Sequence, residues 1–171
     1  MKPIAALMLA AAAAASFAAQ AQNQSPSPSS SSSSAPGQAQ RAPRAGNVTN
    51  ASDPAVKAAT DAAGQAAQAW LALDDADNWD ACWEALAPAV KGQIARDAFA
   101  DSLHTVRNEL GKMTARHPHS VTFTHKMPGA PDGDYVVLQY DTEFANGSAL
   151  ETVIPMRTPD GSWRVSGYFV Q

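Results

Sequence analysis

The sequence lacks most of the features by which small proteins are usually classified. Cys82 is the only cysteine among 171 residues, so an intramolecular disulfide is excluded and the fold must rely on its hydrophobic core. The chain has no serine-nucleophile motif, no phosphate-binding loop and no dinucleotide fingerprint. Cys82 lies between Trp79 and Trp83 in a helical pattern, and we interpret it as a small buried hydrophobic residue rather than a reactive thiol.

Positive charge is scarce after the first 52 residues. All 16 acidic residues and nine of the 12 basic residues lie at or after Asp53, which gives this part a formal charge of −7. This balance argues against nucleic acid and anionic lipid as partners. The apolar run Ile4–Ala15 is too short and too rich in alanine to favour a membrane-spanning helix.

The first 52 residues divide into two segments. Residues 1–21 are typical of a secretory signal peptide, with Lys2 at the charged start and Ala19-Gln20-Ala21 as a small-x-small cleavage site. No cysteine follows that would mark a lipoprotein. Residues 22–52 are rich in Ser, Pro, Gln and Ala and predict a disordered linker. We therefore expect an exported protein, periplasmic or secreted, without stable membrane insertion after signal cleavage.

Residues 53–171 predict a single domain that begins with helices. Ser52 or Asp53 is placed to cap the first helix, with Pro54 just inside it. The apolar stripe of this helix consists of Val56, Ala59, Ala63, Ala67, Trp70 and Leu71. The acidic run Asp74–Asp77 breaks the stripe, and we interpret it as capping and solvated charge, with Asp77 as the cap of a second helix.

A third long helix is predicted from about Arg96 to Leu110. Its stripe is formed by Phe99, Leu103, Val106 and Leu110, and Gly111 is placed as its C-terminal stop.

Strands follow the helices. Asp134–Phe144 alternates, Asn146-Gly147 has the residue types of a tight hairpin turn, and Leu150–Met156 returns. Further strands are predicted at Ser120–Met127 and Ser162–Val170. Helices first and strands after them indicate an α+β domain, with about three N-terminal helices packed on one curved antiparallel sheet of about four strands. The side chains expected to face the helices include Val136, Leu138, Tyr140, Phe144, Leu150, Ile154 and Met156.

Several stretches also resemble a known family. Trp70, Trp83, the segment PGAPDGDYVVLQYDTEFANGSALETV and the terminal GSWRVSGYFV are similar to domain-of-unknown-function family 4019, a set of small exported bacterial domains. The resemblance covers about residues 53–171. It implies a cystatin-like or nuclear-transport-factor-two-like cone, in which helices pack into a curved sheet. It implies no catalytic residues, and the same fold hosts both enzymes and binding modules.

The polar side chains offer few candidates for chemistry. His117 and His119 could share a metal only with further ligands, and we interpret them as part of a polar loop, so we expect no metal site and no cofactor. His125 and Tyr140 share the predicted inward face and are the candidates for an acid or base in an interior pocket. The candidate pocket residues are Trp70, Trp83, Phe123, His125 and Tyr140.

The opposite face of the predicted sheet is a candidate interface. It is half apolar, which often marks a contact surface, and a homodimer through this face is one hypothesis. The candidate residues are Tyr135, Val137, Gln139 and Val153.

Two functional hypotheses follow. In the first, the protein is an exported non-enzymatic domain that binds a small ligand or a protein partner. In the second, it is a cone-fold enzyme that uses His125 as an acid or base. An open cavity that reaches His125 would distinguish the second from the first.

Overall fold

The computed structural model describes residues 53–171, so the predicted signal peptide and linker lie outside the described residues. The element order is α1 (Pro54–Asp75), α2 (Trp79–Glu84), α3 (Pro88–Lys91), α4 (Arg96–Leu110), β1 (Met113–Thr124), β2 (Tyr135–Phe144), β3 (Gly147–Arg157) and β4 (Trp163–Val170). The strands form one open antiparallel sheet in the order β1-β2-β3-β4. The predicted α+β class is confirmed. No helix within residues 53–171 is long and apolar enough to span a membrane.

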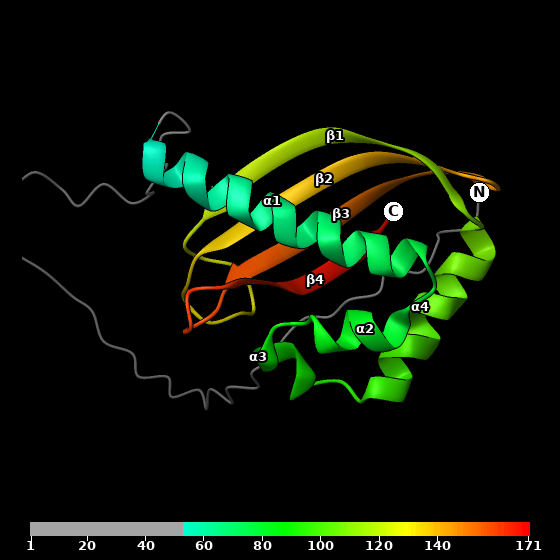
Figure 1. Cartoon of the computed structure of the whole chain (residues 1–171), viewed down its shortest axis with the longest axis horizontal. Coiled ribbons are helices and arrows are strands. Elements are labelled where there is room, and N and C mark those ends of the chain that lie inside the picture. Colours follow the sequence, from blue (N-terminus) through cyan, green and yellow to red (C-terminus); the bar gives the residue numbers. More distant parts are fainter. Residues whose placement is uncertain (1–52) are drawn as a thin grey trace, which may run out of the picture. The chain divides into compact units, whose positions relative to one another are not determined.

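Helix α1 lies across one face of the sheet (Figure 1). Its first turn begins as predicted, since the Asp53 side chain accepts a hydrogen bond from the Ala55 amide at 2.8 Å and Pro54 opens the helix. Small residues such as Ala63 and Ala67 are fully buried and let the helix approach the strands closely. Trp70 then fills the wider space near β4, where its ring lies 5.0 Å from that of Tyr168.

The second helix begins one residue later than predicted. The cap of α2 is Asn78, whose side chain accepts from the Ala81 amide at 3.2 Å. Asp77 instead has φ of 56°, in the left-handed region that non-glycine residues rarely adopt. The chain reverses direction at this residue, between the end of α1 and the start of α2, so Asp77 is not a cap.

The edge of β4 is partly covered by the link between α2 and α3. Leu86 forms an isolated parallel bridge with Val165, and the Ala87 amide donates to the Val165 carbonyl at 2.8 Å.

The opposite edge strand, β1, differs from its prediction. It spans Met113–Thr124 rather than Ser120–Met127. Bulges between Met113 and Ala115 and between Pro118 and Ser120 disturb the alternation of the part before Ser120, which the prediction left out. Pro118 is tolerated because β1 is an edge strand.

Register also corrects the predicted faces of β3. Leu138 pairs with Val153 and Tyr140 with Glu151, and paired residues share a face. Val153 is therefore on the helix side and fully buried, while Leu150, Ile154 and Met156 lie on the open side. The hairpin turn is also shifted by one residue, because Phe144 pairs with Gly147 and the turn consists of Ala145 and Asn146.

The β2–β3 turn is seated on the end of α4. The backbone N–H of Asn146 donates to the Leu110 carbonyl at 3.0 Å, and its side-chain Nδ2 donates to the Glu109 carbonyl at 3.1 Å. Gly111 ends α4 as predicted, with φ of 75°. Figure 1 shows this end of α4 beside the tip of the hairpin.

Gly111→Ala should destabilise the domain by about 1–3 kcal/mol, because a side chain is strained at this φ. A Cβ there would also lie 3.1 Å from the Ala145 Cβ. The matched control is Gly64→Ala in α1, where nothing lies within 4 Å and alanine should add roughly 0.5–1 kcal/mol. Urea unfolding measures both changes, and equal effects would contradict this account of Gly111.

Candidate functional site

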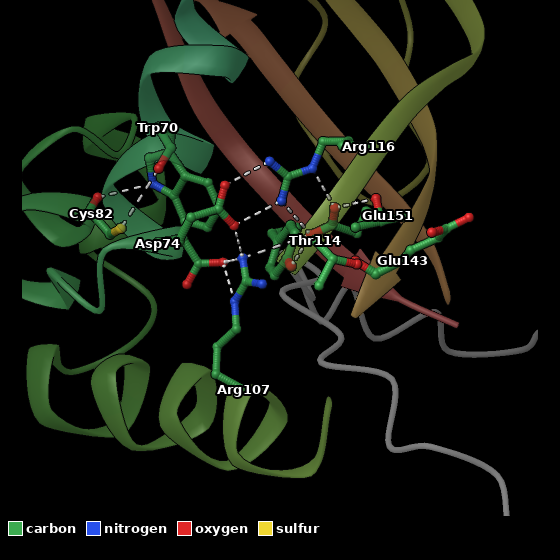
Figure 2. A network of polar contacts seen from close by, with 11 residues as sticks. Trp70, Asp74, Cys82, Arg107, Thr114, Arg116, Glu143 and Glu151 are labelled. Atoms are coloured by element: carbon green, nitrogen blue, oxygen red, sulfur yellow. Dashed lines mark hydrogen bonds and ion pairs between the residues drawn. The ribbon is translucent and has the colours of Figure 1, made fainter. Parts of the chain in front are cut away.

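A cluster of buried charges joins the helices to the sheet. We call it the ionic network, and it consists of Asp74, Asp75, Arg107, Arg116 and Glu151. Its side chains come from α1, α4, β1 and β3, as Figure 2 shows from close by. Charged groups are rarely buried unless they are paired, so each of these elements depends on the others to compensate its charge.

Arg107 connects α4 to the end of α1. Its Nε donates to Asp74 Oδ2 at 2.9 Å, and its Nη2 contacts both Asp74 Oδ2 and, at 2.9 Å, Asp75 Oδ1. The guanidinium also lies 5.2 Å from the centre of the Phe144 ring, a cation–π contact. The Arg107 side chain is only 7% exposed, so this contact is shielded from salt and water.

Arg116 connects β1 to Asp75, which Arg107 also binds, and to Glu151. It donates to Asp75 through Nη1 at 2.7 Å and Nη2 at 2.9 Å, and to Glu151 through Nε at 2.6 Å. Glu151 is fully buried and accepts two further hydrogen bonds, from Thr142 at 2.5 Å and Tyr168 at 2.6 Å. Every strand of the sheet therefore contributes a polar group to this cluster.

The network contains three carboxyl groups and two guanidinium groups. Burial raises the pKa of Asp74 to about 6, against the opposing effect of Arg107. A protonated Asp74 leaves two carboxylates facing two guanidiniums, which is electrically neutral. Burial alone would lower the pKa of Arg107, but Tyr168, Asp74 and Glu151 outweigh it and raise that pKa, so the guanidinium stays charged.

A pocket of about 290 Å³ lies beside the network. We call it the polar pocket, and it is lined by Asp74, Asp75, Asp77, Trp79, His104, Arg107, Asn108, Gly111, Lys112 and Met113. Two of these lining residues each carry a buried polar atom, Asp74 Oδ1 and Trp79 Nε1, that has no hydrogen-bond partner within residues 53–171. The pocket is accessible from solvent, since Asp77 and Lys112 are exposed.

The other wall of the polar pocket is formed by α4. The Asn108 amide lies 2.9 Å from His104 Nε2, which orients the imidazole. The imidazole meets the Trp79 ring nearly edge-on, with ring centroids 5.0 Å apart. This wall therefore combines aromatic surface with polar edges.

The predicted acid–base pair does not form. His125 follows the last residue of β1, is exposed, and lies 2.8 Å from Asp134 through Nδ1. Tyr140 pairs with Pro118, whereas the end of β1 pairs with Tyr135. Five residues of strand therefore separate the two positions, about 16 Å at the usual rise. Phe123 meets the His125 ring edge-on at 4.9 Å, so these two lie together but away from Tyr140.

The remaining pocket candidates lie in different places. The Trp70 indole donates to the Cys82 carbonyl at 3.1 Å inside the core, and Trp83 packs against Phe99 with centroids 5.6 Å apart. Tyr140 lines a separate groove of about 520 Å³ between α1 and the β1–β2 edge. Cys82 is fully buried and burial raises the pKa of its thiol to about 12, which agrees with its interpretation as a hydrophobic residue.

The predicted interface is corrected in part. Tyr135 is 1% exposed and Val153 is fully buried, so neither can form an exposed surface. The Tyr135 ring is covered because its hydroxyl donates to the Pro131 carbonyl at 2.8 Å, under the loop before β2. Val137 and Gln139 do lie half-buried on the open face of the sheet.

The described residues contain no group of three or more His, Cys, Asp or Glu side chains that could hold a metal ion. His119 contacts Asp141 at 2.9 Å on the exposed side of the sheet.

The ionic network was not predicted from the sequence, because the acidic run Asp74–Asp77 was interpreted as solvated charge. The structure buries Asp74 completely and Asp75 largely. A signal was available: Asp74 continues the buried stripe of Ala63, Ala67 and Trp70 at helical spacing. A charged residue on a core-facing stripe needs a buried partner.

Comparison with known proteins confirms the predicted resemblance to family 4019. Residues 66–168 match the family described as "Protein of unknown function (DUF4019)", so the chain belongs to this family. No curated protein and no solved structure matches the chain.

Arg107→Ala should destabilise the domain by about 3–5 kcal/mol, because it leaves the buried Asp74 without its partner and removes one of the two arginines that bind Asp75. The matched control is Arg96→Ala in the same helix, where the pair with Asp80 is exposed and should contribute less than about 1 kcal/mol. Chemical unfolding of both variants measures the difference. A loss of similar size in both would show that burial does not set the strength of the network.

Asp74→Asn should change how stability depends on pH. The raised pKa means that the folded state binds the Asp74 proton more tightly than the unfolded state. The stability that this proton contributes is complete below about pH 4 and is lost as the pH rises through about 6. A pKa shift of roughly two units corresponds to a loss of ~3 kcal/mol in the free energy of unfolding. Asparagine has no such proton, so the variant does not lose this stability as the pH rises. The stability of the variant relative to that of the native protein should therefore increase from pH 4 to pH 7.5. Unfolding at both pH values measures this, and parallel profiles would contradict it.

Proposed function

We propose that this member of the DUF4019 family is a non-enzymatic binding domain that holds a small polar ligand in the polar pocket. The export predicted from residues 1–21 would place the domain in the periplasm or outside the cell, and this part of the proposal rests on the sequence alone.

The two unpartnered atoms in the pocket wall are the observation that carries the proposal. Leaving a buried donor or acceptor unpaired costs about 1–3 kcal/mol, and native proteins leave few such groups. Asp74 Oδ1 and Trp79 Nε1 are both in this state, and both residues line the polar pocket. A ligand that binds each of them recovers this cost, which makes the pocket a favourable place for a polar molecule.

The rigidity of the surrounding groups favours binding. Asp74 and Arg107 are fixed by each other, and Arg107 is also held by Asp75 and by the Phe144 ring. His104 is oriented by Asn108. A pocket whose walls are already ordered needs little further loss of side-chain entropy when a ligand binds.

Native mass spectrometry of the protein purified from its host, followed by thermal unfolding, tests the proposal. A specific co-purifying species should raise the melting temperature by mass action. Trp79→Phe, which removes the unpartnered indole N–H but keeps an aromatic ring, should abolish most of this rise. The matched control is Trp83→Phe in the same helix, whose ring packs against Phe99 outside the pocket wall and should leave the rise intact.

Two results would overturn the proposal. One is the repeated absence of any bound species, which would favour a protein partner instead. The other is a species whose stabilising effect is the same in both tryptophan variants, because it would then bind elsewhere.

A further inference from the structure

We infer that the ligand of the polar pocket is an uncharged molecule rich in hydroxyl groups, of the class of small polyols and monosaccharides. This inference rests on the proposed function and names the chemistry of its ligand.

The unpartnered atoms require both a donor and an acceptor. The indole N–H of Trp79 can only donate, so the ligand must accept there. An ionised Asp74 Oδ1 can only accept, so the ligand must donate there. A hydroxyl group does both, and it can still pair with Asp74 when the carboxyl carries a proton. An ammonium group only donates and a carboxylate only accepts, so neither serves both atoms.

The charges of the wall are balanced when Asp74 carries its proton, the state that its pKa of about 6 favours at pH 5. Arg107 is shared between Asp74 and Asp75, and Asp75 is also bound twice by Arg116. Two opposite charges remain at the exposed rim, Asp77 and Lys112. A net charge on the ligand would therefore enter the pocket without a free buried partner, at a desolvation cost of several kcal/mol. An uncharged ligand avoids that cost.

The size and surface of the pocket agree with this class. At about 290 Å³ the pocket has room for roughly ten water molecules at ~30 Å³ each. This is more space than the few water molecules that two unpartnered atoms would bind. The pocket volume is just below the usual range for ligand pockets, ~300–1,000 Å³, so it suits only a small molecule. Trp79 and His104 add aromatic surface beside the polar atoms. A compact molecule with hydroxyl groups at its edge and C–H groups on its faces can contact both kinds of surface.

The tryptophan indole N–H signals in the NMR spectrum of ¹⁵N-labelled protein provide the test. The protein has four tryptophans, and the Trp79 signal is assigned as the one lost in Trp79→Phe. The probes are glucose, galactose, mannose, ribose, myo-inositol and glycerol at millimolar concentration. Glucosamine and glucuronate are the matched probes, because they keep the sugar ring and add one positive or one negative charge.

We expect at least one neutral probe to shift the Trp79 indole signal. The Trp70 indole is the internal control and should not move, because it already donates to the Cys82 carbonyl. At pH 5, where Asp74 is mostly protonated and the wall is neutral, glucosamine and glucuronate should bind at least ten-fold more weakly than the best neutral sugar.

The other outcomes separate the two proposals. If the charged sugars bind as tightly as the neutral ones, or if the species found by mass spectrometry is charged, the inference about ligand class is wrong while the proposed function stands. If no probe shifts the Trp79 signal, the inference is also wrong. If mass spectrometry then finds no bound species either, the pocket holds ordered water only, and both proposals fail.

Discussion

The contact between Arg107 and the two adjacent carboxylates of α1 is the interaction on which the rest of the domain depends. A guanidinium that is 7% exposed must be paired, and Asp74 and Asp75 can reach it only when α1 lies across the sheet and α4 lies against the end of α1. Arg116 and Glu151 extend the same requirement to β1 and β3. Because a half-assembled set of buried charges is unfavourable, the network links the docking of the helices to the formation of the sheet.

The same requirement shapes the polar pocket. Asp74 is held toward Arg107 through Oδ2, which leaves Oδ1 unpartnered within the described residues. The turn after α1 passes through Asp77 in a left-handed conformation and leads directly to Trp79, the other wall residue with an unpartnered atom. The end of α1 that carries the Arg107 contact also lines the polar pocket, so the proposed ligand site shares Asp74, Asp75 and Arg107 with the ionic network.

Much of the fold could be predicted from local sequence signals. The start of α1 at Asp53 and Pro54 and the end of α4 at Gly111 follow from backbone chemistry that operates within a few residues. The β2–β3 hairpin was also predicted, but its turn is shifted by one residue because Asn146 bonds to the end of α4. The face of β3 was wrong for a related reason, since register depends on which residue of β2 each residue meets.

The candidate site was much harder to predict. Apolar periodicity identifies which positions are buried, but it does not identify charged residues that are buried with partners far away in the sequence. Arg107 and Arg116 lie 33 and 41 residues from the carboxylates that they bind, Asp74 and Asp75. The prediction that His125 and Tyr140 lie together was wrong. Alternation along a strand shows which face of the sheet a residue occupies, but it does not show how far apart two residues on that face are.

The two edges of the sheet are each partly protected, by different means, and this limits how the domain can aggregate. An exposed edge strand is a template for a strand of another molecule. On β4 the backbone of Val165 is already bonded to the segment at Leu86 and Ala87. On β1, Pro118 lacks an amide donor and two bulges disturb the ladder. Addition of strands from a second copy is therefore disfavoured at both edges, and a continuous intermolecular sheet would need one of them to rearrange.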